Sequence, residues 1–198
     1  MRKRQGLIFN LRTLLVFVTI FAAGYLLSAQ QIRSVQPNGA PQSAVAGEPT
    51  EYVQSPELEL KKLEGGTVKL SDYRGKWVFL NIWATWCPPC VYEMPAMEKF
   101  YQKFKSNNLV MLAVSVDDRD KKQDVIDFVL DKKLTFDIFI DPENAVLKGF
   151  KTNSLPSTYI INPEGLIVSQ AMGAREWMDP TVIEYFAGLM AVDKKEAL

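Results

Sequence analysis

The chain has 198 residues, 47% of them hydrophobic, and its 23 lysine and arginine residues balance its 23 aspartate and glutamate residues. This length and composition suit one compact domain with additional segments, and the balanced charge argues against nucleic-acid binding. The sequence contains no histidine and only two cysteines. This excludes a Ser–His or Cys–His catalytic pair and a four-cysteine zinc site within these residues.

Residues 1–29 have the pattern of a membrane-targeting segment. Basic residues at positions 2, 3, 4 and 12 precede the uncharged stretch Leu14–Ala29, as in the positive n-region and apolar h-region of a signal. The stretch is intermediate between an h-region of about 7–15 residues and a spanning helix of about 20. Signal cleavage after Ala29 would place Leu27 at a position where a small residue is preferred. We therefore expect an uncleaved single-pass anchor, with a cleaved signal as the alternative, and an extracytoplasmic domain, on the periplasmic or outer side of the cell membrane.

Residues 30–56 are expected to form a flexible linker. This stretch contains four prolines among many Gln, Ser, Ala and Gly residues, a composition that buries little apolar surface. The folded domain is then expected at residues 57–198.

The first elements of that domain are a hairpin and a strand–helix–strand unit. Alternating residues from Leu58, the Gly65-Gly66 pair and the stretch Thr67–Leu70 predict an N-terminal β-hairpin. The apolar run Trp77–Trp83 predicts a buried central strand. Helical spacing from Pro88 to Lys105 and a second apolar run, Leu109–Val116, complete a βαβ unit with a parallel strand pair. Trp83, Tyr101 and Phe104 are expected to pack in the core.

The remaining elements alternate between helices and strands, which makes the domain α/β with a mixed sheet. Helices are expected at Asp124–Leu130, Pro142–Phe150 and from Asp179 to Met190, and strands at Phe136–Ile140, Thr158–Ile161 and Leu166–Val168. The last helix has an aspartate N-cap followed by proline.

The motif Trp86-Cys87-Pro88-Pro89-Cys90 lies between the buried strand and the first helix. A cysteine at a helix N-terminus faces unpaired backbone N–H groups and the positive end of the dipole, and both favour the thiolate. If Cys87 is the N-cap, Pro89 has no N–H to offer, so we expect the Cys87 sulfur to lie nearest the amide of Cys90. Trp86 is expected to form a partly exposed wall beside the pair.

Other uses of two cysteines fit this motif less well. A c-type haem site needs histidine after the second cysteine, where Val91 stands. A two-cysteine zinc site would need ligands from a second chain, and a purely structural disulfide over three residues would constrain the unfolded chain little. The strand-to-helix context favours redox chemistry.

Three separated blocks resemble the TlpA/ResA-like branch of the thioredoxin superfamily. They are residues 70–76, residues 78–95 around the cysteine motif, and residues 155–165. The resemblance covers about residues 57–173. It implies a thioredoxin-like fold with an N-terminal hairpin and helices on both faces of the sheet. It also implies extracytoplasmic thiol reduction, with apocytochrome c disulfides as typical clients before haem attachment.

The resemblance also implies roles for individual residues. Pro156 is expected to be cis and to face the disulfide, leaving the Leu155 backbone to pair with a client peptide; a loop proline is the alternative. Asn81 stands where thioredoxin itself has a proton-handling aspartate, a departure that this branch shares. Glu93, one helical turn after Cys90, is our candidate for proton handling and for tuning the thiols; an ordinary surface glutamate favoured by the helix dipole is the alternative.

We therefore expect a thiol–disulfide oxidoreductase that reduces client protein disulfides through Cys87 and Cys90. No flavin, nicotinamide or metal motif is visible, so a membrane thiol–disulfide protein is expected to supply the electrons, and the domain is expected to be a monomer. A disulfide-donating oxidase or isomerase and a peptide-binding module are the alternatives. Strong oxidants often carry histidine between the cysteines, where this chain has prolines.

Overall fold

The computed structural model describes residues 52–196, with side chains up to residue 191. The described residues belong to one compact unit, Val45–Leu198. The expected anchor at 1–29 and most of the expected linker lie outside the described residues. Within residues 52–196, no helix has the length and apolar character needed to cross a membrane.

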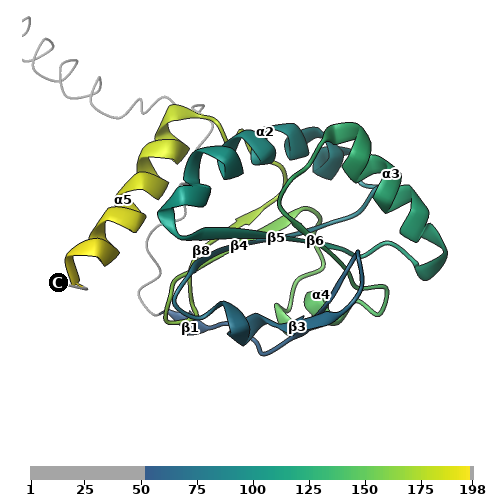
Figure 1. Cartoon of the computed structure of the whole chain (residues 1–198), viewed down its shortest axis with the longest axis horizontal. Coiled ribbons are helices and arrows are strands. Elements are labelled where there is room, and N and C mark those ends of the chain that lie inside the picture. The colour runs from purple at the N-terminus through teal and green to yellow at the C-terminus, as the bar shows by residue number, and fades with distance from the viewer. Residues whose placement is uncertain (1–51, 197–198) are drawn as a thin grey trace, which may run out of the picture. The chain divides into compact units, whose positions relative to one another are not determined.

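The described residues form one eight-stranded sheet in the order β1-β8-β7-β4-β5-β6-β2-β3 (Figure 1). The strands are β1 (Val53–Gln54), β2 (Glu59–Lys62), β3 (Thr67–Lys69), β4 (Trp77–Trp83), β5 (Leu109–Ser115), β6 (Asp137–Ile140), β7 (Ser157–Ile161) and β8 (Leu166–Met172). Strands β4, β5 and β6 run parallel to one another, and the other pairs are antiparallel. The mixed sheet and the β2–β3 hairpin are therefore confirmed.

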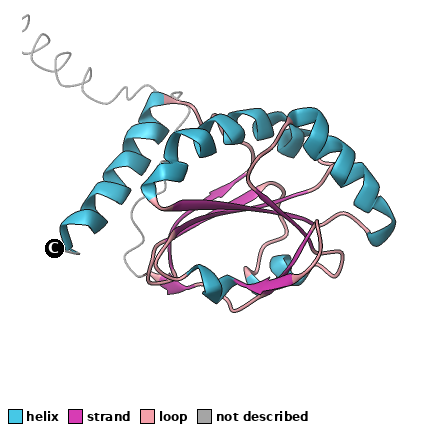
Figure 2. Cartoon of the chain, in the orientation of Figure 1, coloured by secondary structure: helices cyan, strands magenta, loops and turns pink. Residues whose placement is uncertain are grey.

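Four α-helices lie against the sheet within the described residues. They are α2 (Pro88–Phe104), α3 (Lys122–Lys132), α4 (Ala145–Gly149) and α5 (Pro180–Glu196). Short 3-10 turns also occur: η2 (Leu70–Tyr73) between β3 and β4, η3 (Lys105–Asn107) between α2 and β5, and η4 (Arg119–Lys121) between β5 and α3. Figures 1 and 2 show α2, α3 and α5 on one side of the central strands and α4 on the other, as expected. Helix α4 begins later than predicted because Asn144 takes a left-handed conformation, which ends the preceding turn.

Strand β4 is buried along its whole length because both of its faces are covered. On the face toward α2 and α5, the Phe79 ring lies 4.7 Å from the Trp177 ring and 5.5 Å from the Phe100 ring, between centroids. Trp83 and Phe104 are in the core, as predicted. Tyr101 was expected there and is only partly buried: its ring packs edge-on against Phe136 at the margin of the core. A phenol that finds no buried partner is more stable at such a margin.

The folded domain begins earlier than the predicted boundary at residue 57. Val53 and Gln54 pair with Ile167 and Leu166 of β8, and the Ser55 N–H donates to the Gly165 carbonyl at 3.0 Å. These residues belong to the stretch expected to be linker. Two paired residues carry no periodic pattern of their own, so the sheet edge alone decides that they are a strand.

Candidate active site

Cys87 and Cys90 form a disulfide at the N-terminus of α2. Cys87 is the N-cap with an extended backbone, Pro88 and Pro89 open the helix, and the Cys90 N–H donates to the Cys87 sulfur at 3.4 Å. This confirms the predicted contact. The Cys87 residue is 5% exposed and Cys90 is fully buried, so Cys87 is the one that reaches the surface. The helix N-terminus favours the thiolate form of Cys87 once the pair is reduced.

The segment before β7 lies at the same edge of the sheet as the cysteines. Ser157, the first residue of β7, pairs with Ile82 near the end of β4, so Pro156 and Leu155 lie beside the strand end that leads to Cys87. Pro156 is buried and its bond to Leu155 is cis, as expected. Leu155 is half-buried, and neither its N–H nor its carbonyl makes a hydrogen bond with another described residue. Trp86 is 63% exposed.

Glu93 is a buried carboxylate, 1% exposed, and not a surface glutamate. Its Oε1 accepts a hydrogen bond of 3.0 Å from Asn81 Nδ2. Its Oε2 accepts bonds of 3.0 Å from the Arg175 backbone N–H and 2.9 Å from Trp177 Nε1. Glu93 therefore lies one turn after Cys90, at the centre of a network that joins β4, α2 and the β8–α5 loop.

Two opposing influences act on the proton affinity of Glu93. Burial raises its pKa above the ordinary value of 4.5, while the hydrogen bonds from Trp177, Arg175 and Asn81 and the positive charge of Arg175 act to lower it. The burial effect is larger, so the net direction is upward. A carboxyl with a raised pKa one turn from a cysteine can exchange a proton at a higher pH than a surface acid, and its role in catalysis remains a prediction.

The hydrogen bonds of Asn81 show why an amide suits residue 81 better than an acid. Its Nδ2 donates both to Glu93 and to Thr158 Oγ1 of β7, at 3.0 and 2.9 Å. An aspartate at residue 81 would place a second buried carboxylate at hydrogen-bond distance from Glu93, and two like charges in one buried site disfavour ionisation.

Asp117, which the sequence reasoning did not single out, holds the loop that leads to the cysteines. It is 3% exposed and follows β5 directly. Its carboxylate accepts bonds from the Thr85 N–H at 2.9 Å, the Thr85 hydroxyl at 2.5 Å and the Ser115 hydroxyl at 2.6 Å. The sequence could have indicated Asp117 by its position directly after a predicted strand. The carboxyl ends of neighbouring parallel strands meet at one edge of the sheet, so a polar residue after β5 lies near the loop after β4.

Arg175 and Trp177 were also missed, and no local pattern marks them. They lie between β8 and α5, at sequence separations of 82 and 84 from Glu93. Only the tertiary fold brings this loop to α2.

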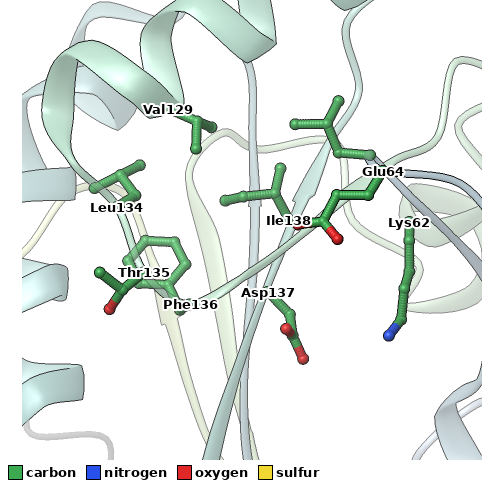
Figure 3. Close-up of a pocket in the computed structure, with 9 residues that line it drawn as sticks. Lys62, Glu64, Val129, Leu134, Thr135, Phe136, Asp137 and Ile138 are labelled. Atoms are coloured by element: carbon green, nitrogen blue, oxygen red, sulfur yellow. The ribbon is translucent and has the colours of Figure 1, made fainter.

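A separate pocket of about 170 Å³ lies at the other end of the parallel strands (Figure 3). Lys62, Glu64 and Asp137 border it, over an apolar wall that includes Leu134 and Ile138. Asp137 begins β6, whereas the cysteine motif follows the end of β4. The pocket is therefore not part of the disulfide site. No cluster of three or more Cys, Asp or Glu residues suited to a metal ion occurs in the part of the chain that the structure describes.

Comparison with known proteins yields a consistent group of relatives. Residues 53–170 match the AhpC/TSA family. The thiol–disulfide oxidoreductase ResA of Geobacillus thermodenitrificans is 36% identical over 167 residues, which are 84% of this chain and 87% of that protein. ResA of Bacillus subtilis (strain 168) is 33% identical over 175 residues, 87% of this chain and 88% of that protein.

Solved structures agree with the sequence relatives. A thiol:disulfide interchange protein DsbE from Chlorobium tepidum superposes with a TM-score of 0.61 at 27% identity, covering 72% of this chain and 96% of its own. StoA from Bacillus subtilis superposes with a TM-score of 0.56 at 26% identity, covering 67% of this chain and 97% of its own. The similarity therefore extends over nearly the whole of each neighbour.

Proposed function

The chain belongs to the AhpC/TSA family of thioredoxin-fold proteins and is a thiol–disulfide oxidoreductase; from this premise we propose that it reduces disulfides in client proteins on the extracytoplasmic side of a membrane. The observation that carries the proposal is the asymmetry of the cysteine pair. Cys87 reaches the surface at a helix N-terminus, and Cys90 is buried behind it. This arrangement suits one attacking and one resolving cysteine.

The catalytic cycle is a two-electron exchange. The Cys87 thiolate attacks one sulfur of the client disulfide, the client S–S bond breaks, and the leaving client thiolate takes up a proton. The Cys90 thiol then loses its proton and attacks the Cys87 sulfur, which breaks the mixed disulfide and releases the second client thiolate. The client gains two electrons, the Cys87–Cys90 pair loses two, and a dithiol protein in the membrane restores the pair.

Client binding uses residues beside the disulfide. The free N–H and carbonyl of Leu155 would pair with an extended client segment, with Pro156 below it and Trp86 as an exposed apolar wall. Glu93 would accept the proton that Cys90 loses when it resolves the mixed disulfide, because it is buried one helical turn away and its pKa is raised.

The cellular setting is argued from the sequence. Basic residues before the apolar stretch of residues 1–29 support a single-pass anchor with the domain outside the cytoplasm. Residues 30–52 would act as a tether, and the domain would work as a monomer. We further propose apocytochrome c, before haem attachment, as the client class, on the resemblance to the TlpA/ResA-like branch.

The decisive measurement is the reduction potential of the Cys87–Cys90 pair in the purified chain. A value near or below about −250 mV supports a reductant that a membrane donor recharges. A value of about −120 to −180 mV would instead make the protein a disulfide donor or isomerase. Cys87→Ser separates catalysis from peptide binding. A protein that only binds clients would keep its client affinity and its full activity in this variant, whereas a reductase would lose client reduction.

A further inference from the structure

Three consecutive residues of the β8–α5 loop hold two consecutive residues of α2. The Arg175 N–H and Trp177 Nε1 donate to Oε2 of Glu93, at 3.0 and 2.9 Å. Between them, Glu176 accepts a bond of 3.2 Å from the Tyr92 hydroxyl. The loop is therefore attached to α2 both at the surface, through Tyr92, and in the interior, through Glu93.

The indole of Trp177 is held in a fixed orientation. Trp177 is 3% exposed, and its ring packs edge-on against Phe79 at 4.7 Å and Phe100 at 6.2 Å, between centroids. Just after it, the Asp179 N–H closes a turn onto the Glu176 carbonyl at 2.9 Å. Because the ring cannot turn without disturbing the aromatic cluster, its N–H stays directed at the Glu93 carboxylate.

We propose that Trp177, together with the Arg175 N–H, is the positioning element for Glu93, and that its fixed N–H favours the ionised form of the Glu93 carboxylate beside the cysteine pair, against the effect of burial. The inference rests on the proposed function, in which Glu93 takes the proton of Cys90. It goes beyond that function by assigning control of this proton to the β8–α5 loop.

The physical argument is that the three described atoms in contact with the Glu93 carboxylate are all hydrogen-bond donors. A backbone N–H, an indole N–H and an amide NH₂ group each stabilise a carboxylate, whereas a protonated Glu93 would present its own hydrogen to one of these donors. The Arg175 charge acts in the same direction, and burial acts in the opposite one. The titratable groups nearest to Glu93 along α2 and the β8–α5 loop are Cys90, one turn earlier, and, at the surface, Tyr92 and Glu176.

Trp177→Phe tests the assignment because phenylalanine keeps an aromatic ring in the cluster but has no N–H to donate to Glu93. A charge-assisted hydrogen bond of this kind corresponds to about 1–2 pH units in the titration of its acceptor. We therefore expect the Glu93 midpoint to rise by about 1–2 pH units in this variant. The midpoint is read from the side-chain carboxyl ¹³C resonance in the oxidised protein, assigned with Glu93→Gln. The oxidised form has no thiol that could contribute to the titration.

Trp83→Phe is the matched control. Trp83 is also a buried tryptophan on the same side of β4, packed on Phe128, and its indole nitrogen has no hydrogen-bond partner among the described residues. This substitution is expected to leave the Glu93 midpoint unchanged. If Trp83→Phe and Trp177→Phe moved the midpoint equally, loosened packing would explain the shift and the assignment to the Trp177 N–H would be overturned.

The unmodified protein supplies a second measurement that does not depend on how a variant folds. The Trp177 indole ¹H–¹⁵N resonance should titrate with the same midpoint as the Glu93 carboxyl, and should lose that titration in Glu93→Gln. An indole resonance that does not respond to pH, or an unchanged Glu93 midpoint in Trp177→Phe, would overturn the proposal.

Failure of the proposed function gives a different result. The pH profile of Cys87 alkylation in the reduced protein reports whether Glu93 is coupled to the thiols. If the unmodified protein and Glu93→Gln gave the same alkylation profile, the role of Glu93 in client reduction would be overturned. The carboxyl titration in the oxidised protein would still decide the assignment of Trp177.

Discussion

Two buried carboxylates adjoin the cysteine motif, Asp117 through Thr85 and Glu93 on α2, and they are held in different ways. Asp117 accepts two of its three bonds from hydroxyl groups, on Thr85 and Ser115. Glu93 accepts only from N–H groups. A hydroxyl can turn and accept a hydrogen bond if its partner becomes protonated, and an N–H cannot. The groups that contact Glu93 are therefore suited to a carboxylate, whereas two of the three that contact Asp117 are hydroxyl groups.

The difference assigns the two acids different tasks. Asp117 joins the ends of β4 and β5 and so holds the loop that carries Cys87. Glu93 follows Cys90 on the helix and is connected to a distant loop. The hydrogen bonds of Asp117 make it a structural clamp on the motif, and Glu93 is the acid that we propose handles the proton of Cys90.

The largest effect is expected from replacing the two cysteines that these acids adjoin. Cys87→Ser should reduce client-disulfide reduction to background, a loss on the order of 10³-fold or more, because the nucleophile is gone. Cys90→Ser should instead accumulate a mixed disulfide between Cys87 and the client, visible on a non-reducing gel. Accumulation in Cys87→Ser and not in Cys90→Ser would reverse the order of the two cysteines.

The clamp is tested by Asp117→Ala. The substitution leaves the Thr85 N–H and the hydroxyls of Thr85 and Ser115 without their acceptor, so we expect a loss of about 2–4 kcal/mol in the free energy of unfolding. Urea denaturation of the oxidised protein measures it. A change below about 0.5 kcal/mol would show that water replaces the carboxylate and that Asp117 is no clamp.

The acid is tested by the pH dependence of stability. Because the folded state raises the pKa of Glu93 above its ordinary 4.5, the folded protein binds this proton more tightly than the unfolded chain does. The stabilisation is complete below pH 4.5 and is lost as pH rises through the folded pKa. Relative to Glu93→Gln, the unmodified protein should lose up to about 1.4 kcal/mol per pH unit over that interval. Parallel stability curves for the two proteins would contradict a raised pKa.

The smallest effect is expected from Thr85→Val. It removes one hydroxyl donor and leaves Asp117 its bonds from the Thr85 N–H and from Ser115. The loss should be about 0.5–1.5 kcal/mol by the same urea titration, well below that of Asp117→Ala. Equal losses in the two variants would mean that the bond from the Thr85 hydroxyl to Asp117 accounts for the whole clamp, and that the bonds from the Thr85 N–H and Ser115 contribute nothing.

The amino-acid sequence by itself determined the elements and the position of the chemistry. The apolar run of β4, the helical spacing of α2 and the turn residues of the β2–β3 hairpin are local patterns, and each predicted the element that formed. The Cys87 contact with the Cys90 N–H also followed from the sequence, because Pro89 removes the competing donor within a single helical turn.

Only the tertiary structure decided which groups surround the cysteine pair. Glu93 could be placed one turn from Cys90, but one of its hydrogen bonds comes from Trp177, which is 84 residues away in the sequence. The pairing of Val53–Gln54 with β8 and the bonds of Asp117 to Thr85 likewise join segments far apart in the chain. Periodicity and capping report interactions within a few residues, whereas burial and hydrogen bonding of a side chain depend on the elements that the fold packs against it.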